Sequence, residues 1–380
     1  MRIALCLECP LHQHGGVEVL VRELIRGLHQ KFELYLVSAD LGDVIQASSF
    51  GPMLKGCLPY DPLADKRQEA ARIAQWGREE GIDLFHFHHG GTYTWGSRTW
   101  THCVITEVAN AGFRCVSTNH GAFGLMGFVG EQRPLGYKLA AMCLCWPAKL
   151  RQVASVEWEA TVSQHDWKAV QRWFFPLRHK FIQIYHSMLD GSEVFTPQKR
   201  NIILCLGTVG ARKGQPYLAE AFGQIAHKHP DWRLVIAGRH GCDLTTHAMF
   251  AAIRKHGIED QVDVLTEVPD AQAIDLLRHA AIFAMPSLAE GLGLSLQEAM
   301  FHGAACAGTT AGGITDMIEH EKTGLLVPPA DPSALAAALE RLITDPSLRA
   351  RLAETGRRSI PAKGMTRQGM WQRHAQLYLG

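Results

Sequence analysis

The sequence predicts an α/β protein built from two doubly wound, Rossmann-like domains, each with a parallel sheet. Short apolar runs typical of buried strands alternate with segments whose apolar residues recur at helical spacing, and this alternation predicts sheets covered by helices. The pattern fills the first 184 residues and begins again near residue 200. The 380 residues are 47% hydrophobic and 20% charged, which is the composition of a globular protein that can bury two cores.

The first half opens with a strand, a turn and a helix. Arg2–Leu7 is an apolar run, Gly15 and Gly16 form a turn, and apolar residues from Val17 onward recur along one helix face. A second apolar run follows, and a βαβ unit of this kind implies parallel strands joined by a right-handed crossover. The later strands of this half are expected at residues 32–37, 84–87, 115–118, 160–163 and 181–184.

The second half repeats the architecture without an evident sequence repeat. We place the first domain at residues 1–188 and the second at 189–363, with a hinge in the polar, turn-rich segment 189–200. An apolar-periodic stretch within 364–380 predicts a last helix that can pack on either domain. Strands of the second half are expected at residues 201–207, 232–238, 262–265, 281–286 and 324–327.

Composition also excludes several classes of function. Lys+Arg 38 against Asp+Glu 37 gives a net charge of +1, which disfavours a nucleic-acid partner. The ten scattered cysteines favour reduced, buried thiols over a disulfide framework. The N-terminal run is too short for a signal segment, and we find no apolar run of the ~18 residues that a spanning helix requires. We therefore expect a cytoplasmic location.

The stretch from Pro286 to Met300 carries the clearest chemical pattern. A predicted strand ends before Pro286, a glycine-interrupted loop follows, and a helix begins near Ser295. Free backbone N–H groups would then lie at the carboxyl edge of a parallel sheet, where a helix start favours a diphosphate.

Two carboxylates flank this expected anion site. Glu290 lies in the loop and Glu298 lies one turn into the helix. Carboxylates do not bind phosphate, but they accept hydrogen bonds from sugar diols, so the arrangement suits a nucleotide sugar. An alternative for Glu298 is a capping box with Ser295, and the two roles are sterically compatible.

This stretch resembles the E-x7-E signature of the retaining glycosyltransferases of family GT4, which have the GT-B fold. Gly15 and Gly16 resemble the N-terminal glycine loop of that family, and Lys213-Gly214 resembles its KG turn. Residues 185–190 resemble its inter-domain element, and the pattern continues through the Gly312-Gly313 pair to about residue 330. The resemblance is specific in the C-terminal half and loose in the N-terminal half.

The resemblance implies a GT-B architecture, in which a donor-binding second domain and an acceptor-binding first domain face a cleft. It implies that Glu290 contacts hydroxyls of the donor sugar and that Glu298 contacts the ribose. The backbone of Gly293 and Leu294, with Gly291 beside them, would face the phosphates. Lys213 would neutralise the leaving diphosphate, whose departure builds negative charge.

The resemblance implies a catalytic His120 as well, at the expected end of a strand, and a donor-binding Gly16 in the N-terminal glycine loop. An alternative for His120 is an ordinary surface-loop histidine. A neutral or protonated imidazole at this position would also stabilise the charge of the leaving group.

One position departs from the pattern of the family. The family usually carries an Arg five residues before the Lys, whereas this chain has Thr208, which donates a hydrogen bond but no charge. Either Arg212 or Arg239 replaces that Arg in space, or the enzyme is slow or takes another donor. Asp316 stands where the family often has Glu.

Other cofactor and metal sites are not favoured. His86 and His88 share one face of a strand without a carboxylate or Cys partner in register, so we expect no metal there. The sequence lacks the G-x-G-x-x-G and P-loop patterns of the usual NAD and ATP sites. It also lacks Asp-x-Asp, so we expect neither a cofactor nor a divalent metal.

The sequence thus predicts a retaining glycosyltransferase that moves a sugar from a UDP- or GDP-sugar to a hydroxyl of a glycan or lipid-linked acceptor. Two alternatives stay open: a catalytically impaired nucleotide-sugar-binding subunit, motivated by Thr208, and an epimerase of the same fold. Residues 121–146 would form an acceptor loop, a membrane-touching surface or a packed helix. A basic and aromatic region predicts contact with an anionic membrane. Its residues are Lys138, Lys149, Arg151, Lys168, Arg172, Arg178 and Lys180, with Trp146, Trp167, Trp173, Phe174 and Phe175.

Overall fold

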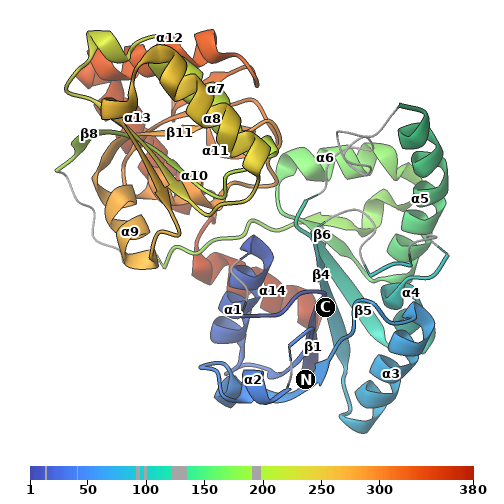
Figure 1. The fold of residues 1–380 in the computed structure, drawn as a ribbon. Coiled ribbons are helices and arrows are strands. Elements are labelled where there is room, and N and C mark those ends of the chain that lie inside the picture. Colours follow the sequence, from blue (N-terminus) through green and yellow to red (C-terminus); the bar gives the residue numbers. More distant parts are fainter. Residues whose placement is uncertain (13–14, 41, 91–94, 98–100, 122–134, 191–197) are drawn as a thin grey trace. The chain divides into compact units, whose positions relative to one another are not determined.

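The computed structural model describes residues 1–380 except 13–14, 41, 91–94, 98–100, 122–134 and 191–197. The chain forms two compact units, which are described here each by itself (Figure 1). Unit 1 is Met1–His186 with Arg367–Gly380, and unit 2 is Ser187–Thr366. The boundary predicted between residues 188 and 189 lies close to this one. The central part of the expected loop at 121–146 lies outside the described residues, as does most of the expected hinge.

Unit 1 contains a parallel sheet, seven-stranded in the part of the chain that the structure describes, in the order β3-β2-β1-β4-β5-β6-β7. The order reverses at β1, which pairs with β2 on one side and with β4 on the other. The strands are β1 (Arg2–Leu7), β2 (Glu33–Ser38), β3 (Leu54–Pro59), β4 (Leu84–His89), β5 (Arg114–Asn119), β6 (Glu159–Thr161) and β7 (Phe181–Gln183).

Helices cover both faces of this sheet, as Figure 1 shows for α1 and α14 on one side and for α3 and α4 on the other. Alternate residues of β1 separate two cores, because Ile3 and Leu5 pack with the first pair of helices and Ala4 and Cys6 with the second. The helices of unit 1 are α1 (Gly16–Leu28), α2 (Gly42–Gln46), α3 (Lys66–Glu79), α4 (Val104–Asn110), α5 (Leu135–Ser155), α6 (Gln164–Trp173) and α14 (Arg367–Leu379).

The last helix of the chain, α14, belongs to unit 1. Its Trp371 indole N–H donates to the carbonyl of Glu23 at 2.9 Å. A Cβ at Gly27 of α1 would lie 2.1 Å from the Trp371 ring, so this close contact between α1 and α14 requires glycine. The sequence allowed this helix to pack on either domain, and in the structure it packs on the first.

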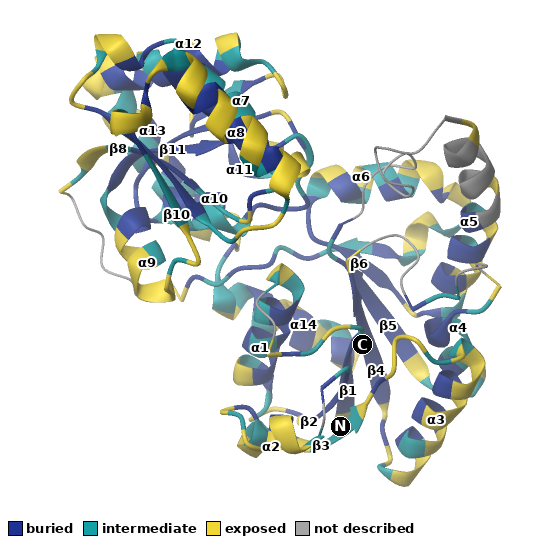
Figure 2. Ribbon diagram, in the orientation of Figure 1, coloured by how far each residue is buried: buried dark blue, intermediate teal, exposed yellow. Residues whose placement is uncertain are grey.

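Unit 2 has a parallel sheet that is six-stranded within its described residues, in the order β10-β9-β8-β11-β12-β13. Most strand residues are buried on both faces, which is usual for a parallel sheet between helices (Figure 2). The strands are β8 (Arg200–Leu206), β9 (Arg233–Gly238), β10 (Val262–Thr266), β11 (Ala280–Met285), β12 (Ala305–Thr309) and β13 (Leu325–Val327).

The helices of unit 2 alternate with these strands. A large core joins α7, α8, α12 and α13 to the sheet, with Phe222, Ile236 and Leu339 fully buried in it. The helices are α7 (Gln215–Gly223), α8 (Asp243–His256), α9 (Asp270–His279), α10 (Leu294–Phe301), α11 (Ile314–Met317), α12 (Pro332–Thr344) and α13 (Pro346–Ala362).

The sequence prediction found most of the strands and omitted β3 and β12. β3 is an edge strand whose residues include Gly56 and Pro59, both poor strand formers. β12 reads Ala-Cys-Ala-Gly-Thr, and its small side chains give a weak hydrophobic signal although the strand is fully buried. The doubly wound α/β class is confirmed in both units.

The cysteines are free thiols rather than disulfides. Among the described residues, no helix is both long enough and apolar enough to cross a membrane.

Candidate functional site

The loops that follow β8 and β11 define the candidate site of unit 2. β8 lies between β9 and β11, so the strand order of the sheet reverses there. In open α/β sheets the crevice beside such a reversal, at the carboxyl ends of the strands, is the usual ligand site. The predicted Lys213 follows β8 and the predicted Glu290 follows β11, so both lie at this edge.

Backbone contacts hold these two loops together. The carbonyl of Arg212 accepts a hydrogen bond from the Leu288 N–H at 2.7 Å. Gly214 has φ +69°, and a Cβ there would lie 2.0 Å from the carbonyl oxygen of Pro286. The glycine of the Lys-Gly turn therefore permits both the left-handed turn and the close approach of the two loops.

The side chains of Lys213 and Glu290 form an ion pair. Lys213 Nζ lies 2.6 Å from Glu290 Oε2, and Ser287 Oγ donates to the same oxygen at 3.2 Å. The Lys213 side chain is 27% exposed and the Glu290 side chain 11%, so solvent and ligands can reach the pair from the lysine side. The structure thus brings together two of the predicted catalytic residues, 77 positions apart in the sequence.

The glycine pair directly before α11, Gly312 and Gly313, supports the Glu290 loop. The N–H of Gly313 donates to the carbonyl of Glu290 at 3.1 Å. Gly312 has φ +55°, and a Cβ there would lie 1.8 Å from that same carbonyl oxygen. The sequence analysis noted this glycine pair only as part of a resemblance. Its contact with Glu290 was missed, because the sequence does not show which loops meet.

Helix α10 begins directly beside this ion pair. Its N-cap is Gly293, with φ +90° and ψ +64°, and no described side chain caps the helix. No described side chain therefore caps the backbone N–H groups of Leu294 and Ser295 in the first turn. Such a helix start favours the binding of an anion. Because Ser295 lies inside the helix, the capping-box interpretation of Ser295 and Glu298 is wrong. Glu298 is half-buried one turn into α10, and Gly291 is buried in the preceding loop.

The position that departs from the family lies at the same edge. Thr208 is exposed, and its carbonyl accepts from the buried Gln215 side chain at 3.1 Å. The neighbouring Val209 N–H donates to the carbonyl of Arg239 at 2.8 Å. Main-chain bonds therefore hold Arg239 beside the Thr208 loop and Arg212 beside the Glu290 loop, and both arginines stay candidates for the missing charge. Asp316 lies in α11, where its carbonyl accepts from Lys363 Nζ at 2.5 Å.

The remaining predicted site residues, Gly16 and His120, lie in unit 1. Gly16 is the first residue of α1 and is exposed, and a Cβ there would meet nothing within 4 Å. At Gly15, by contrast, a Cβ would lie 2.1 Å from Glu18 Oε2. The predicted cleft, which would join these residues to unit 2, stays a prediction.

His120 follows β5 and is half-buried. Its main-chain N–H donates to the carbonyl of His89 at 2.8 Å, and its Nε2 lies 3.1 Å from Nδ1 of His88. Burial, reinforced by the neighbouring His89 and His374, lowers the pKa of His120 to about 3. The imidazole is therefore neutral near pH 7.

The contact between His120 and His88 is part of a buried histidine cluster, which we define as His86, His88, His120, His186 and His374. Ring centroids are 4.0 Å apart for His86 and His88, 5.1 Å for His120 and His186, and 5.7 Å for His86 and His374. Burial lowers the pKa of each member, to about 4 in His374.

The sequence pattern placed His86 and His88 on one strand face, with no metal expected there, and it did not predict the histidine cluster. The sequence offered one signal for this cluster, because histidines lie at the ends of two neighbouring strands. In the β4–β5 register, His88 lies opposite Thr118 and His89 lies opposite Asn119, the residue before His120. The contributions of His186 and His374 come from distant segments. Among the described residues, no group of three or more His, Cys, Asp or Glu side chains has a geometry that could hold a metal ion.

A buried ion pair lies on the face of the unit 1 sheet opposite to the histidine cluster. Lys149 Nζ of α5 lies 2.5 Å from Glu159 Oε2, and both side chains are fully buried. Ser117 Oγ donates to the same carboxylate at 3.0 Å, and His89 Nε2 lies 3.5 Å from it. Burial raises the pKa of Glu159, but Lys149 and His89 lower it more, to about 2.

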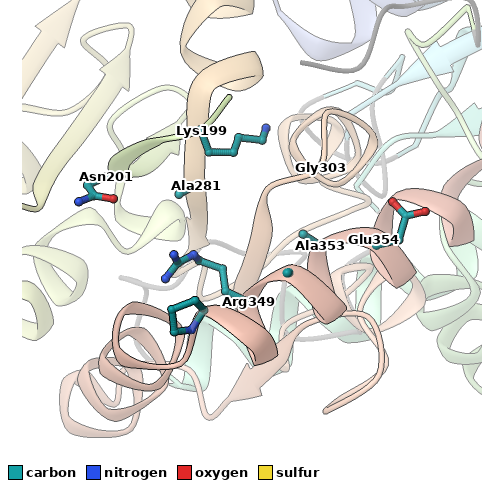
Figure 3. A pocket seen from close by; sticks show the side chains of 9 residues that line it. Lys199, Asn201, Ala281, Gly303, Arg349, Ala353 and Glu354 are labelled. Atoms are coloured by element: carbon teal, nitrogen blue, oxygen red, sulfur yellow. The ribbon is translucent and has the colours of Figure 1, made fainter. Parts of the chain in front are cut away.

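A separate cavity of about 300 Å³ lies at the amino-end edge of the unit 2 sheet (Figure 3). Its polar lining groups already have protein partners. Lys199 Nζ donates to the carbonyls of Arg278 and His302, at 2.8 and 2.6 Å. Arg349 donates to main-chain carbonyls and lies over the Trp232 ring. This cavity is therefore a weaker candidate than the opposite edge of the sheet, which carries Lys213 and Glu290.

The chain matches two families of glycosyltransferases. The family described as glycosyl transferases group 1 matches residues 192–359, and glycosyltransferase family 4 matches residues 14–185. A lipopolysaccharide core biosynthesis mannosyltransferase of Rhizobium leguminosarum bv. viciae is 30% identical over 43% of this chain and 46% of its own length. An α-D-kanosaminyltransferase of Streptomyces kanamyceticus is 30% identical over 41% of this chain and 39% of its own. The matched region thus spans less than half the length of these relatives.

Solved structures resemble the chain over almost its whole length. A sucrose-phosphate synthase from Thermosynechococcus elongatus has a TM-score of 0.76 at 19% identity, over 99% of this chain and 98% of its own. The Anabaena protein HepE, solved in complex with UDP, has a TM-score of 0.74 at 16% identity, over 100% and 99%. These likenesses show the GT-B fold. The two family matches together cover both units and show that the chain belongs to the glycosyltransferases of family GT4.

Proposed function

We propose that this protein is a retaining glycosyltransferase that moves a sugar from a nucleoside-diphosphate donor to a hydroxyl of a glycan or lipid-linked acceptor. The observation that carries the proposal is the ion pair of Lys213 and Glu290 beside the uncapped start of α10. A cation, a helix start and a carboxylate together match the phosphates and the sugar hydroxyls of such a donor.

The ion pair suggests how the donor enters. Lys213 and Glu290 neutralise one another when the site holds no donor. On binding, the ammonium of Lys213 turns to the diphosphate, and Glu290 Oε2 becomes free to accept from sugar hydroxyls. The N–H groups at Leu294 and Ser295 bind the phosphate oxygens, and Glu298 accepts from the ribose.

Bond cleavage then places negative charge on the departing diphosphate, where Lys213 and the helix start stabilise it. With retention of configuration, the acceptor oxygen bonds to the anomeric carbon on the face that the diphosphate leaves. The acceptor proton passes to the leaving phosphate oxygen, so the step needs neither an enzymic nucleophile nor a metal. For the two predicted site residues of unit 1, we expect His120 to contact the donor sugar and Gly16 to contact the phosphates.

Relatives support the proposed substrate classes. HepE was solved with UDP and with UDP-glucose, which supports a UDP-sugar as the first donor to test. The Rhizobium relative is named for mannosyl transfer in lipopolysaccharide core synthesis, which supports a lipid-linked acceptor.

A panel of UDP- and GDP-sugars tests the proposal. Release of nucleoside diphosphate should accompany sugar transfer to a glycan or lipid-linked acceptor for at least one donor, and the product should keep the anomeric configuration of the donor. Nucleotide binding without turnover of any donor would favour an impaired subunit, the second candidate that exposed Thr208 motivates. Release of an epimerised donor without an acceptor would favour an epimerase.

We also propose that a patch on unit 1 contacts an anionic membrane. The aromatic-basic patch consists of the exposed Lys168, Arg172, Trp173, Phe175 and Arg178 on α6 and the turn that follows it. Trp173 is 45% exposed and Phe175 67%. Exposed aromatic rings among cations suit the interface of an anionic bilayer.

The patch is smaller than the sequence predicted. Lys149 is fully buried against Glu159, and Phe174 is 2% exposed, so neither can reach a membrane. Lys180 donates to the carbonyls of Ala154 and Val156, both at 2.7 Å. The indole N–H groups of Trp146 and Trp167 also donate to main-chain carbonyls, while the Lys138 side chain lies outside the described residues.

A further inference from the structure

His88, which lies beside His120, takes no part in the mechanism proposed above. His88 lies near the end of β4, one strand from His120, and its side chain is buried with 1% of the residue exposed. Its Nδ1 lies 3.1 Å from Nε2 of His120. One imidazole of this pair must donate the hydrogen and the other must accept it, so the direction of this bond fixes where each ring carries its proton.

The surroundings of His88 decide that direction. Its other nitrogen, Nε2, is buried and has no hydrogen-bond partner among the described residues. Buried N–H groups without an acceptor are rare in proteins, whereas buried acceptors without a donor are somewhat more common. The proton of His88 is therefore on Nδ1, which donates to His120. Nε2 of His120 accepts, and its own proton is on Nδ1.

The packing around His88 keeps its ring in place. The His86 ring packs against it at a centroid distance of 4.0 Å, with the two ring planes tilted by 35°. His86 is itself held at both nitrogens, with Nδ1 at 2.6 Å from the Tyr378 hydroxyl of α14 and Nε2 at 2.8 Å from Thr118 Oγ1. In α14, His374 Nδ1 lies 2.9 Å from the carbonyl of Met370, which can only accept, so His374 also carries its proton on Nδ1.

We propose that His88 is a positioning residue that holds His120 as the neutral Nδ1–H tautomer. The half-exposed His120 then presents a fixed N–H donor to an oxygen of the donor sugar or of the departing diphosphate. The inference rests on the proposed function for the role of His120, but the tautomer itself is a property of the free protein.

Nitrogen NMR of the histidine side chains tests the tautomer directly. In protein labelled with ¹⁵N at histidine, long-range ¹H–¹⁵N spectra near pH 7.5 distinguish a protonated from an unprotonated ring nitrogen. The signals of His120 are those lost in H120N. We expect a protonated Nδ1 and an unprotonated Nε2 for His120. A protonated Nε2 in the wild type would overturn the inference.

Three variants of His88 separate hydrogen bonding from packing. In His88→Asn the side-chain amide occupies the position of Nδ1 and can still donate to His120. In His88→Gln the amide reaches the position of Nε2 instead, and in His88→Leu no donor is left. The His120 tautomer should persist in H88N and shift toward Nε2–H in H88Q and H88L. An unchanged tautomer in folded H88L would contradict the inference, and circular dichroism establishes which variants fold.

Kinetics add a second readout with the donor and acceptor identified by the panel. H88L and H88Q should lose about tenfold in kcat with little change in KM, as expected for one hydrogen bond misdirected in the transition state. H88N should keep most of the wild-type rate, which loss of packing alone would not explain. If the tautomer is as expected and no donor is turned over, the proposed function fails alone. If transfer occurs and the tautomer differs, this inference fails alone.

Discussion

Units 1 and 2 share one architecture, but they hold their polar groups in opposite ways. Unit 2 places a charged pair, Lys213 and Glu290, at a partly open sheet edge where glycines let two loops approach closely. Unit 1 buries a neutral histidine cluster between its sheet and α14, and a charged pair, Lys149 and Glu159, on the opposite face. Accessible charge suits the binding of a charged ligand, whereas buried groups position other residues, such as the half-exposed His120, and stabilise the unit.

The largest effect should come from breaking the buried pair of unit 1. Lys149→Met leaves the Glu159 carboxylate buried without its ammonium partner, which should cost about 3–5 kcal/mol of stability. The measurement is denaturant unfolding at pH 7.5. The double variant Lys149→Met with Glu159→Leu should recover most of the loss, because no unpaired charge remains. A loss below about 1 kcal/mol in the single variant, the range of an exposed ion pair, would contradict the comparison.

In unit 2 the corresponding change should affect catalysis instead of stability. Lys213→Ala and Glu290→Gln should each lower the transfer rate by about 10²–10³-fold, as measured with the donor that the panel identifies. Their unfolding midpoints should stay close to that of the wild type, because the pair is partly exposed. Lys228→Ala is a matched control, since it removes another lysine of unit 2 that pairs with a glutamate, Glu340, at 2.9 Å. Wild-type turnover in K213A or E290Q would remove the site assignment.

The histidine cluster should make unit 1 sensitive to acid. Its members have folded-state pKa values below the ordinary value of about 6.5, so the unfolded chain binds protons first as the pH falls. Stability is then complete above about pH 6.5 and decreases below it, by about 1.4 kcal/mol per pH unit for each histidine that stays neutral.

His374→Leu removes one member of the cluster and should reduce this slope by about one proton between pH 6 and pH 5. The measurement is the pH dependence of the unfolding free energy. His247→Asn, which replaces an exposed histidine of unit 2, is the matched control. Equal slopes in the wild type and H374L would mean that His374 does not stay neutral in the folded protein.

The smallest effect should come from the aromatic-basic patch of unit 1. Binding to vesicles that contain anionic lipid should fall with added salt. The double variant Trp173→Ala with Phe175→Ala should weaken it by several-fold, because two exposed rings no longer enter the interface. Replacement of two exposed apolar residues of unit 2, Leu244→Ala with Ile274→Ala, is the control. Absence of binding at low salt would remove the membrane proposal.

The two units also differ in how much the sequence could predict. The site of unit 2 is encoded in short local patterns, because a strand end, a glycine turn and a helix start lie within a few residues of one another. The sequence therefore predicted Glu290 and a helix start near Ser295, one residue after the observed start at Leu294. Lys213 came from the resemblance to family GT4, and the sequence did not show that Gly312 lies against the Glu290 carbonyl.

The histidine cluster of unit 1 could not be predicted in the same way. His86 and His120 come from neighbouring strands, but His186 and His374 reach them through tertiary packing of distant segments. Lys149 belongs to a basic, aromatic stretch and was therefore expected at the surface. In the structure it is fully buried and pairs with Glu159 of β6. Composition does not show which lysine of such a stretch faces the core.

The affinity of the protein for its nucleotide tests the central claim most directly. Calorimetric titration with UDP and GDP should show that one of them binds the wild type and K228A equally. The same nucleotide should bind K213A about tenfold or more weakly, because a charge-assisted hydrogen bond to the diphosphate is lost. Equal affinity of folded K213A and wild type would contradict the assignment of Lys213 and Glu290 as the donor site.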